Sequence, residues 1–427
     1  MFVIDAALEN RVLRRLLLFI MPTVLIAFMD RINISFAAAT MNPAIGINPQ
    51  VFGIGAGIFF VGYLLFEIPS NLLMHRVGAR VWIPRIMVTW GLVSAALAFA
   101  VGPVSFLSLR FLLGVAEAGL IPGLMLYASY WIAPRRLGTF TSLMFVMAPI
   151  GGAVTALISG VILKLDGAAG LAGWQWLFIL EGLPAVLLGI VGFFYLDSRP
   201  RDARWLSESE KQQIEASLAT ISADQTGETA SDRWVVLKNH RMWICAVAYL
   251  LMNVALGSQP WLPLLFAPFK TSSVETGVIL AVANGLAALS MVFWARRSDK
   301  SLERLNHLLI ASVVSAIGWF LCGYPAGSLA LLSVGTTLAL VGLNSSFVVF
   351  WTIPSSFLLP HERPVGIAVV TCVGLIGASL APVVTGYIRQ ATGSYEGGMY
   401  LAAVGIILSA LTARLAVPAT LPRRAAA

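Results

Sequence analysis

The sequence predicts an all-α polytopic membrane protein that crosses the membrane twelve times. Of its 427 residues, 58% are hydrophobic and only 11% are charged, whereas about 25% of the residues of an ordinary soluble domain are charged. The charged residues form short clusters, and the apolar stretches between them are roughly 20 residues long, the length that spans a ~30 Å hydrocarbon core. These stretches are expected to be helices, because a helix pairs its own backbone polar groups inside the lipid.

The first predicted span, 16–40, follows a group of arginines and carries Asp30 and Arg31 in its interior. A cleaved signal peptide is the alternative interpretation, but its apolar core would be shorter and would not contain an Asp-Arg pair. We therefore expect this segment to be the first span. The other predicted spans are 52–74, 82–101, 104–127, 138–163, 174–197, 240–267, 275–295, 305–323, 328–352, 364–389 and 397–418.

Lys and Arg collect in every second connection between these spans, and such connections are cytoplasmic. Both termini are then expected in the cytoplasm, with the chain in a bacterial-type inner membrane. The basic connections contain Arg11, Arg14 and Arg15; Arg76, Arg80 and Arg85; Arg135 and Arg136; Arg199 to Lys238; Arg296, Arg297, Lys300 and Arg304; Arg363; and Arg414, Arg423 and Arg424.

This topology accounts for the net charge of +8. The basic residues lie at the ends of apolar segments rather than on one solvated face, so no nucleic-acid partner is expected. The three cysteines have no paired spacing, and the four histidines fall at span ends or in loops, so the sequence predicts no metal and no cofactor. It contains no phosphate-binding loop and no nucleophile motif, which argues against an enzyme.

One long polar stretch divides six spans from six. The predicted organisation is a first bundle over 1–198, a cytoplasmic linker over 199–239 and a second bundle over 240–427. Within the linker, Ser207 and Glu210 have the spacing of a capping box, which predicts a surface helix over about 208–219 and a flexible segment over 220–232. The basic loops at 71–80 and 295–304 resemble one another, as in the parallel repeats of the major facilitator fold.

Six ionisable side chains lie inside the predicted spans. Each costs ~3 kcal/mol or more at the centre of a bilayer, so they are expected to face a cavity or one another. At 1.5 Å per residue, Asp30 and Glu117 both fall near mid-membrane, while Arg110 and Glu117 are two turns apart on one helix face. The six residues are Asp30, Arg31, Glu67, Arg110, Glu117 and Glu181.

Chemistry separates the roles of these residues. Arginine stays charged and offers a planar fork to a carboxylate, so Arg31 or Arg110 is the expected anchor for an anionic substrate. Burial favours the protonated form of a carboxyl group and a nearby guanidinium favours the ionised form. Asp30 and Glu117 can therefore carry a proton whenever a substrate occupies the arginine. The alternative is that Asp30–Arg110 and Arg31–Glu117 are permanent structural ion pairs.

The remaining candidates in the first half lie nearer the membrane surfaces. Glu67 is placed near the cytoplasmic end of its span and Glu181 near the outer end of another, so we expect gating or structural roles for both. Tyr63 precedes Glu67 by one helical turn, and its hydroxyl is a candidate substrate contact.

The second half has neutral polar residues where the first has charges. Asn344, Trp351 and Thr371 are the candidate substrate contacts there. Neutral donors suit hydroxyl groups or the far end of a substrate, although such residues often only join one helix to another.

Four motifs together resemble the anion:cation symporter family of the major facilitator superfamily. They are Asp30-Arg-Ile-Asn-Ile-Ser35, Gly62-Tyr-Leu-Leu-Phe-Glu-Ile-Pro-Ser-Asn71, Arg110-Phe-Leu-Leu-Gly-Val-Ala-Glu-Ala-Gly119 and Trp176-Leu-Phe-Ile-Leu-Glu-Gly182. The resemblance implies a transporter of organic anions such as tartrate, phthalate or sugar acids, usually coupled to protons. It also implies protonation at Asp30 and Glu117, and anion contact through Arg31 and Arg110.

Two positions depart from this family. Family members that handle sugar acids tend to have an asparagine in the eleventh span, where this chain has Thr371-Cys372. In the first basic loop, which also contains Arg80, His75 replaces the acidic residue that the superfamily usually has. The second basic loop retains an acidic residue, Asp299. A strongly hydroxylated substrate is therefore less expected, and Arg80 and Asp299 are assigned gating or structural roles.

The expected function is import of a small carboxylate by proton symport. A single chain with its two bundles is expected to act as a monomer in the lipid bilayer. An anion exchanger that does not move protons is the alternative. A membrane sensor or an integral membrane enzyme would need a soluble domain or a catalytic cluster, and the sequence predicts neither.

Overall fold

The computed structural model describes residues 5–225, 232–301, 303–325, 327–359 and 362–416. Within these residues it is all-α, and twelve helical segments are long and apolar enough to cross a membrane, as predicted. These segments are Ala6–Ala44, Pro49–Val77, Ala79–Phe99, Pro103–Ser129, Arg136–Leu165, Gly173–Tyr195, His240–Phe269, Ser273–Ser301, Arg304–Cys322, Leu329–Phe357, Val365–Thr392 and Glu396–Ala416.

The chain forms two compact units. The first holds the described residues up to 225 together with Ala267–Ala281, and the second holds the remainder. The helices of the first unit are α1 (Ala6–Ala44), α2 (Pro49–Val77), α3 (Ala79–Ala96), α4 (Pro103–Glu117), α5 (Leu120–Ser129), α6 (Pro134–Ile162), α7 (Gly173–Tyr195) and α8 (Glu208–Gln225).

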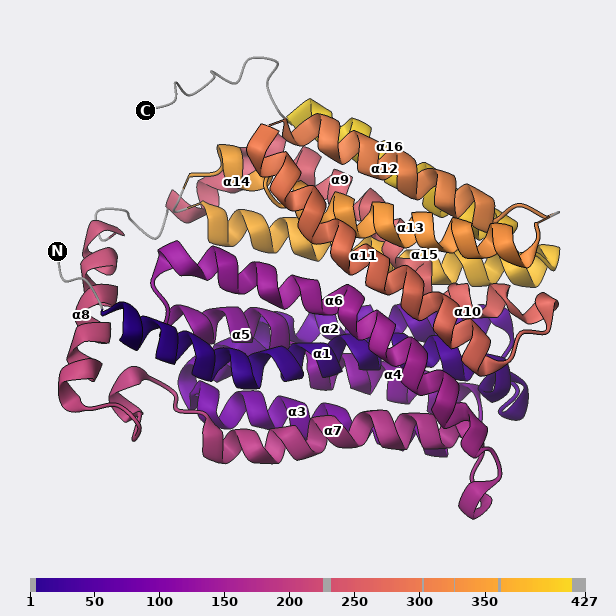
Figure 1. The fold of residues 1–427 in the computed structure, drawn as a ribbon, viewed down its shortest axis with the longest axis horizontal. Coiled ribbons are helices and arrows are strands. Elements are labelled where there is room, and N and C mark those ends of the chain that lie inside the picture. Colours follow the sequence, from indigo (N-terminus) through magenta and orange to yellow (C-terminus); the bar gives the residue numbers. More distant parts are fainter. Residues whose placement is uncertain (1–4, 226–231, 302, 326, 360–361, 417–427) are drawn as a thin grey trace. The chain divides into compact units, whose positions relative to one another are not determined.

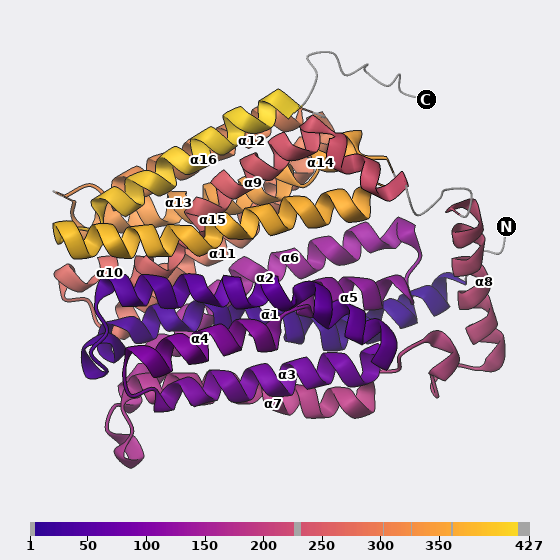
Figure 2. The same cartoon turned by 180° about the vertical axis from the view of Figure 1, so that it is seen from behind.

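In the first unit α3 packs against α7, α2 against α4, and α1 against both α6 and α7 (Figures 1 and 2). Glycine permits the closest of these approaches. A Cβ atom added to Gly114 of α4 would lie 2.0 Å from the carbonyl oxygen of Phe59, and one added to Gly62 of α2 would lie 2.5 Å from that of Phe111. The backbones of α2 and α4 therefore lie in contact, which brings the polar residues of α4 close to α2.

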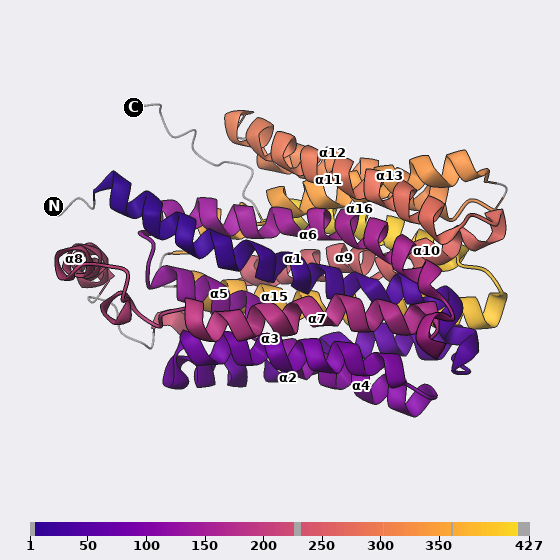
Figure 3. The same cartoon turned by 60° about the horizontal axis from the view of Figure 1, so that its bottom comes forward.

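The helix α8 lies across the end of the first unit where α1 begins (Figures 1 and 3). The predicted capping box is present, since Ser207 N donates to Glu210 Oε2 at 2.8 Å and Glu210 N donates to Ser207 Oγ at 3.3 Å. The helix continues to Gln225, six residues beyond the predicted end, because 208–225 contains neither Gly nor Pro. Part of the predicted flexible segment, 226–231, lies outside the described residues.

Glu210 also ties α8 to α1. Its carboxylate accepts a hydrogen bond from Arg11 as well as from the backbone of Ser207. These two interactions, the backbone one first, hold the pKa of Glu210 below its usual value.

The second unit contains α9 (His240–Gly257), α10 (Leu262–Leu265), α12 (Arg304–Cys322), α13 (Leu329–Phe350), α14 (Pro354–Phe357), α15 (Arg363–Thr392) and α16 (Glu396–Ala416). The helix α11 (Ser273–Ser301) begins in the first unit and ends in the second. Within the second unit α9 packs against α15 and α16, and α12 packs against α13 and α16 (Figure 2).

The predicted span over 104–127 is not one continuous helix. It is divided into α4 and α5 by Ala118 and Gly119. Pro122 explains the break, because proline has no N–H to donate to the carbonyl of Ala118 four residues before it. Gly119 has φ +83°, and an added Cβ would lie 2.6 Å from Ser70 Oγ, so both its backbone conformation and the lack of space require glycine.

Candidate functional site

An ion pair between Arg31 and Glu117 lies at this helix break. Arg31 Nε donates to Glu117 Oε1 at 2.8 Å, and Arg31 Nη2 lies 2.6 Å from the same oxygen. The Glu117 side chain is fully buried, whereas 20% of the Arg31 side chain remains exposed. The Arg31 side chain is thus partly accessible, although its Nη2 is itself buried, while the carboxylate is enclosed by protein.

Aromatic rings surround the guanidinium of Arg31. Its Cζ lies 5.0 Å from the ring centroid of Tyr63, 5.6 Å from that of Phe28 and 5.7 Å from that of Phe59. Faces of aromatic rings attract a cation without neutralising it as a carboxylate does. The guanidinium is therefore held in place on several sides, and Glu117 is its direct anionic partner.

The helix break determines where Glu117 lies. Glu117 is the last residue of α4, and Ala118 is extended with ψ 133°. The carbonyls of the last turn of a helix have no partner within the helix and give this end a partial negative charge, which favours a nearby cation. The guanidinium of Arg31 thus pairs with a carboxylate carried by the last residue of a helix.

Asp30 forms a separate group of contacts. Its Oδ1 accepts hydrogen bonds from Ser94 Oγ of α3 and, at 3.2 Å, from Asn33 Nδ2. The side chain is 1% exposed, and within the described part of the chain its Oδ2 has no hydrogen-bond partner. Two neutral donors and one unpaired oxygen leave room for a proton on this carboxyl group.

Arg110 makes no direct hydrogen bond or ion pair with Asp30 among the described residues, although the two side chains interact electrostatically. Arg110 Nε instead donates to the carbonyl oxygen of Gly55 at 3.0 Å, and its Cζ lies 5.1 Å from the ring centroid of Phe59. Its Nη1 is buried and has no partner among the described residues. The close approach of α2 and α4 places a backbone carbonyl within reach of Arg110, and this competing acceptor is not visible in the sequence pattern.

The two outlying carboxylates differ in their surroundings. Glu67 has its Oε2 buried without a partner among the described residues, and it interacts electrostatically with Arg31. Glu181 is 3% exposed and accepts a hydrogen bond from Ser159 Oγ at 2.8 Å. Arg80 lies elsewhere, at the start of α3, and its Nε donates to the carbonyl oxygen of Phe193 in the last turn of α7 at 3.1 Å.

The candidate residues of the second unit do not form one cluster of direct contacts. Trp351 packs edge-on against the ring of Tyr249, with the centroids 4.9 Å apart, and against that of Phe350 at 5.7 Å. Asn344 and Thr371 each bond back to their own helix, to the carbonyls of Leu340 and Ile367, both at 2.9 Å.

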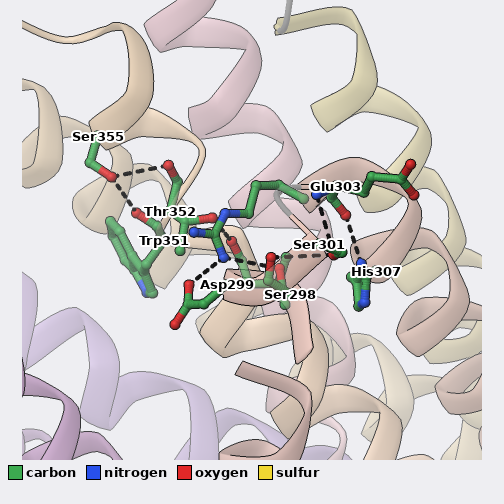
Figure 4. Close-up of polar contacts among 10 residues, drawn as sticks. Ser298, Asp299, Ser301, Glu303, His307, Trp351, Thr352 and Ser355 are labelled. Carbon is green, nitrogen blue, oxygen red and sulfur yellow. Dashed lines mark hydrogen bonds and ion pairs between the residues drawn. The ribbon is translucent and has the colours of Figure 1, made fainter. Parts of the chain in front are cut away.

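Figure 4 shows the polar contacts near Trp351 and near Asp299. Ser355 Oγ donates to the carbonyls of Trp351 and Thr352 at 3.2 Å and 3.0 Å. Asp299 accepts from Arg304 Nη1 at 2.5 Å, and the same nitrogen lies 3.1 Å from Ser298 Oγ. Asp299 thus links the end of α11 to the start of α12.

Three features of the site were not anticipated from the sequence. They are the hydrogen bonds of Ser94 and Asn33 to Asp30, the hydrogen bond from Arg110 to the carbonyl of Gly55, and the helix break beside Glu117. The break had a signal in the sequence, because Gly119 and, three residues later, Pro122 both disfavour a continuous helix. Among the described residues, no group of three or more His, Cys, Asp or Glu side chains is arranged to hold a metal ion.

Comparison with known proteins identifies the family. The sequence pattern of the Major Facilitator Superfamily matches residues 20–359. A protein of Agrobacterium vitis described as a putative tartrate transporter is 41% identical over 416 residues, which cover 95% of this chain and 95% of that protein. A quinolone resistance transporter of Acinetobacter baumannii is 35% identical over 394 residues, 90% of each chain.

The fold is also found among solved structures. The crystal structure of a D-xylose-proton symporter is similar with a TM-score of 0.77 and 14% sequence identity, covering 95% of this chain and 98% of that chain. With twelve apolar helices, these similarities identify a secondary transporter rather than an enzyme. The chain belongs to the Major Facilitator Superfamily, as the sequence motifs predicted.

Proposed function

We propose that this transporter imports a small organic anion together with a proton by alternating access. The observation that carries the proposal is the ion pair of Arg31 and Glu117, in which the carboxylate is fully buried and the Arg31 side chain is 20% exposed. The similarity to a protein described as a putative tartrate transporter supports a carboxylate as the substrate.

The geometry supports a simple exchange of partners at Arg31. A substrate carboxylate that approaches along the partly exposed Arg31 side chain competes with Glu117 Oε1 for Nε and Nη2. Once displaced, the Glu117 carboxylate is buried without its hydrogen-bonded partner, with Arg110 acting on it electrostatically, and a buried carboxylate that loses such a partner binds a proton more readily. The substrate and the proton then enter together, and release of both inside restores the ion pair.

Asp30 is the second proton site in this proposal. Its Oδ2 has no partner among the described residues, and its contacts from Ser94 and Asn33 are neutral. A proton on Asp30 removes a buried negative charge next to the pair, and this lowers the cost of bringing an anion to Arg31.

The remaining candidate residues have two proposed roles. The proposed further substrate contacts are Arg110, Tyr63, Asn344, Trp351 and Thr371. The proposed gating or structural residues are Glu67, Glu181, Arg80 and Asp299.

The proposed setting is a bacterial-type inner membrane with both termini in the cytoplasm. This orientation follows from the basic residues in alternate connections. The proposed partners are the organic anion, protons and the lipid bilayer, and we propose the monomer as the functional form.

Proteoliposomes that contain a pH-sensitive dye test the proposal. L-Tartrate and a panel of mono- and dicarboxylates are added outside to wild type, Asp30→Asn and Glu117→Gln, with Glu275→Gln as the control. Glu275 caps the exposed start of α11 by accepting from Ser272 N at 2.8 Å. Substrate-driven acidification of the lumen in wild type and in the control, but in neither site variant, is the expected result.

The anion exchanger is the competing outcome of the same experiment. Labelled substrate would then enter only when another anion has been preloaded, and the dye would report no acidification. In that case Arg31 and Glu117 would be a structural pair, and both site variants would retain exchange.

A further inference from the structure

A third buried carboxylate lies beside the proposed proton sites. Glu181 in α7 is 3% exposed, and its Oε1 accepts from Ser159 Oγ at 2.8 Å. Its Oε2 is buried and has no hydrogen-bond partner within the described residues. No cation is paired with this group in the described part of the chain, although an uncompensated buried charge is costly in a membrane.

Asn33 connects Glu181 to Asp30. Its Nδ2 donates to Asp30 Oδ1 at 3.2 Å, and the same side chain also interacts with the carboxyl group of Glu181. An amide nitrogen carries two N–H groups, so one Asn33 can serve two carboxylates at once. Asn33 is itself 1% exposed, so the three side chains form one buried group.

The described residues that act on Glu181 are neutral except for one carboxylate. The helix α7 packs against α1, α3 and α6. From α1, Asp30 and Asn33 act on Glu181, and from α6 Ser159 does so, while no charged side chain of α3 takes part. Asp30 in turn interacts with Ser94 of α3 and with Arg110 and Glu117 of α4.

The depth of Glu181 places it on the outer side of Asp30. Glu181 is eight residues from the start of α7 at Gly173, and Asp30 is fourteen residues from the end of α1 at Ala44. These ends are extracellular in the proposed topology. At 1.5 Å per residue the two distances are about 12 Å and about 21 Å.

We propose that Asp30 and Glu181 form a carboxylate pair, joined by Asn33, that binds one proton, with Glu181 as the member that receives it from outside. The proton passes from Glu181, which becomes a carboxylate, to Asp30, which becomes a carboxylic acid. Two ionised carboxylates in one buried group repel each other, so the pair holds a proton in preference to none. This inference rests on the proposed proton symport and assigns Glu181 a role in its coupling.

The test is the rate of substrate-driven uptake by proteoliposomes as a function of external pH, with counterflow of labelled substrate at equal pH as the second readout. The variants are Glu181→Gln and Ser159→Ala, with Glu275→Gln and Ser142→Ala as matched controls. Ser142 is exposed on α6, and its hydroxyl donates within its own helix to the carbonyl of Gly138 at 2.9 Å.

Glu181→Gln should retain counterflow within about twofold of wild type and move the pH of half-maximal uptake about one unit lower. The neutral amide removes the repulsion that favours proton binding by the pair, so a higher external proton concentration is needed. Ser159→Ala should shift the profile in the opposite direction, to higher pH, and by less, because the loss of its hydrogen bond makes an ionised Glu181 less favourable and so strengthens proton binding by the pair. Both controls should match wild type.

An unchanged pH profile in Glu181→Gln would overturn the inference. A parallel loss of counterflow and uptake in this variant would also overturn it, because it would show that Glu181 has a structural role. If Glu181→Gln has no cooperative melting transition, an unshifted Ser159→Ala profile would overturn it instead. Failure of the proposed function has a different signature, because wild type would then take up substrate without any movement of protons.

Discussion

Arg31 in the middle of α1 is paired with Glu117 at the last residue of α4, two residues before a glycine with φ +83°. The pair is therefore built where a membrane-spanning helix is interrupted. Interrupted helices in transporters place unpaired backbone groups and charged side chains next to the substrate. In this chain the arrangement pairs a partly exposed arginine side chain with a fully buried carboxylate.

Replacing Arg31 with lysine should raise KM for the transported carboxylate about tenfold or more, which corresponds to ~1.4 kcal/mol. Lysine keeps the charge but lacks the planar fork, and its point charge cannot serve the substrate from two nitrogens. The measurement is initial uptake into proteoliposomes over a range of substrate concentrations. Arg14→Lys, on the exposed side of the same helix, is the control and should keep the wild-type KM; an unchanged KM in Arg31→Lys would argue against substrate contact.

Gly119→Ala should lower the free energy of unfolding by about 2 kcal/mol or more. Alanine would have to adopt the left-handed backbone conformation of Gly119, which is strained for a residue with a side chain, and its Cβ would lie 2.6 Å from Ser70 Oγ. Thermal unfolding in detergent, followed by tryptophan fluorescence, measures the change. Gly138→Ala is the matched control because no atom lies within 4 Å of its added Cβ; equal melting temperatures for the two variants would contradict the account of the helix break.

Acid should weaken the attachment of α8. The pKa of Glu210 is held below its ordinary value of 4.5 by Ser207 and Arg11. A lowered carboxyl pKa contributes stability that is complete above the unfolded-state value and is lost as the pH falls through the lower folded-state value. Amide exchange over 208–212 should thus be slower in wild type than in Glu210→Gln at neutral pH, and the difference should vanish well below pH 4.5. A difference that persists there would exclude the carboxylate as its source.

Trp351→Phe should raise KM about tenfold while leaving the melting temperature almost unchanged. Phenylalanine preserves an aromatic ring next to Tyr249, 4.9 Å away between centroids, but removes the indole N–H, which has no partner within the described residues. Uptake kinetics and thermal unfolding give the two quantities. Trp319→Phe is the control, because Trp319 is fully buried in α12 and should affect stability but not KM.

The amino-acid sequence by itself determined the class of this protein, its twelve spans, its superfamily and the residues that carry its buried charge. Each of these depends on composition or spacing along one chain. Runs of about 20 apolar residues have one stable state in lipid, and a charge inside such a run is conspicuous wherever the helix packs. The pairing of Arg31 with Glu117 was among the predicted alternatives for the same reason, since both are charged and similar in depth.

Only the tertiary structure decided which neutral groups complete the site. Asp30 and Arg110 have opposite charges and comparable depth, yet Asp30 is bonded to Ser94 and Asn33, and Arg110 to the carbonyl of Gly55. The choice depends on how closely α2 approaches α4, which is set by the absence of side chains at Gly62 and Gly114. Backbone carbonyls and hydroxyl groups occur along every helix, so their competition for a charged side chain is settled by helix packing.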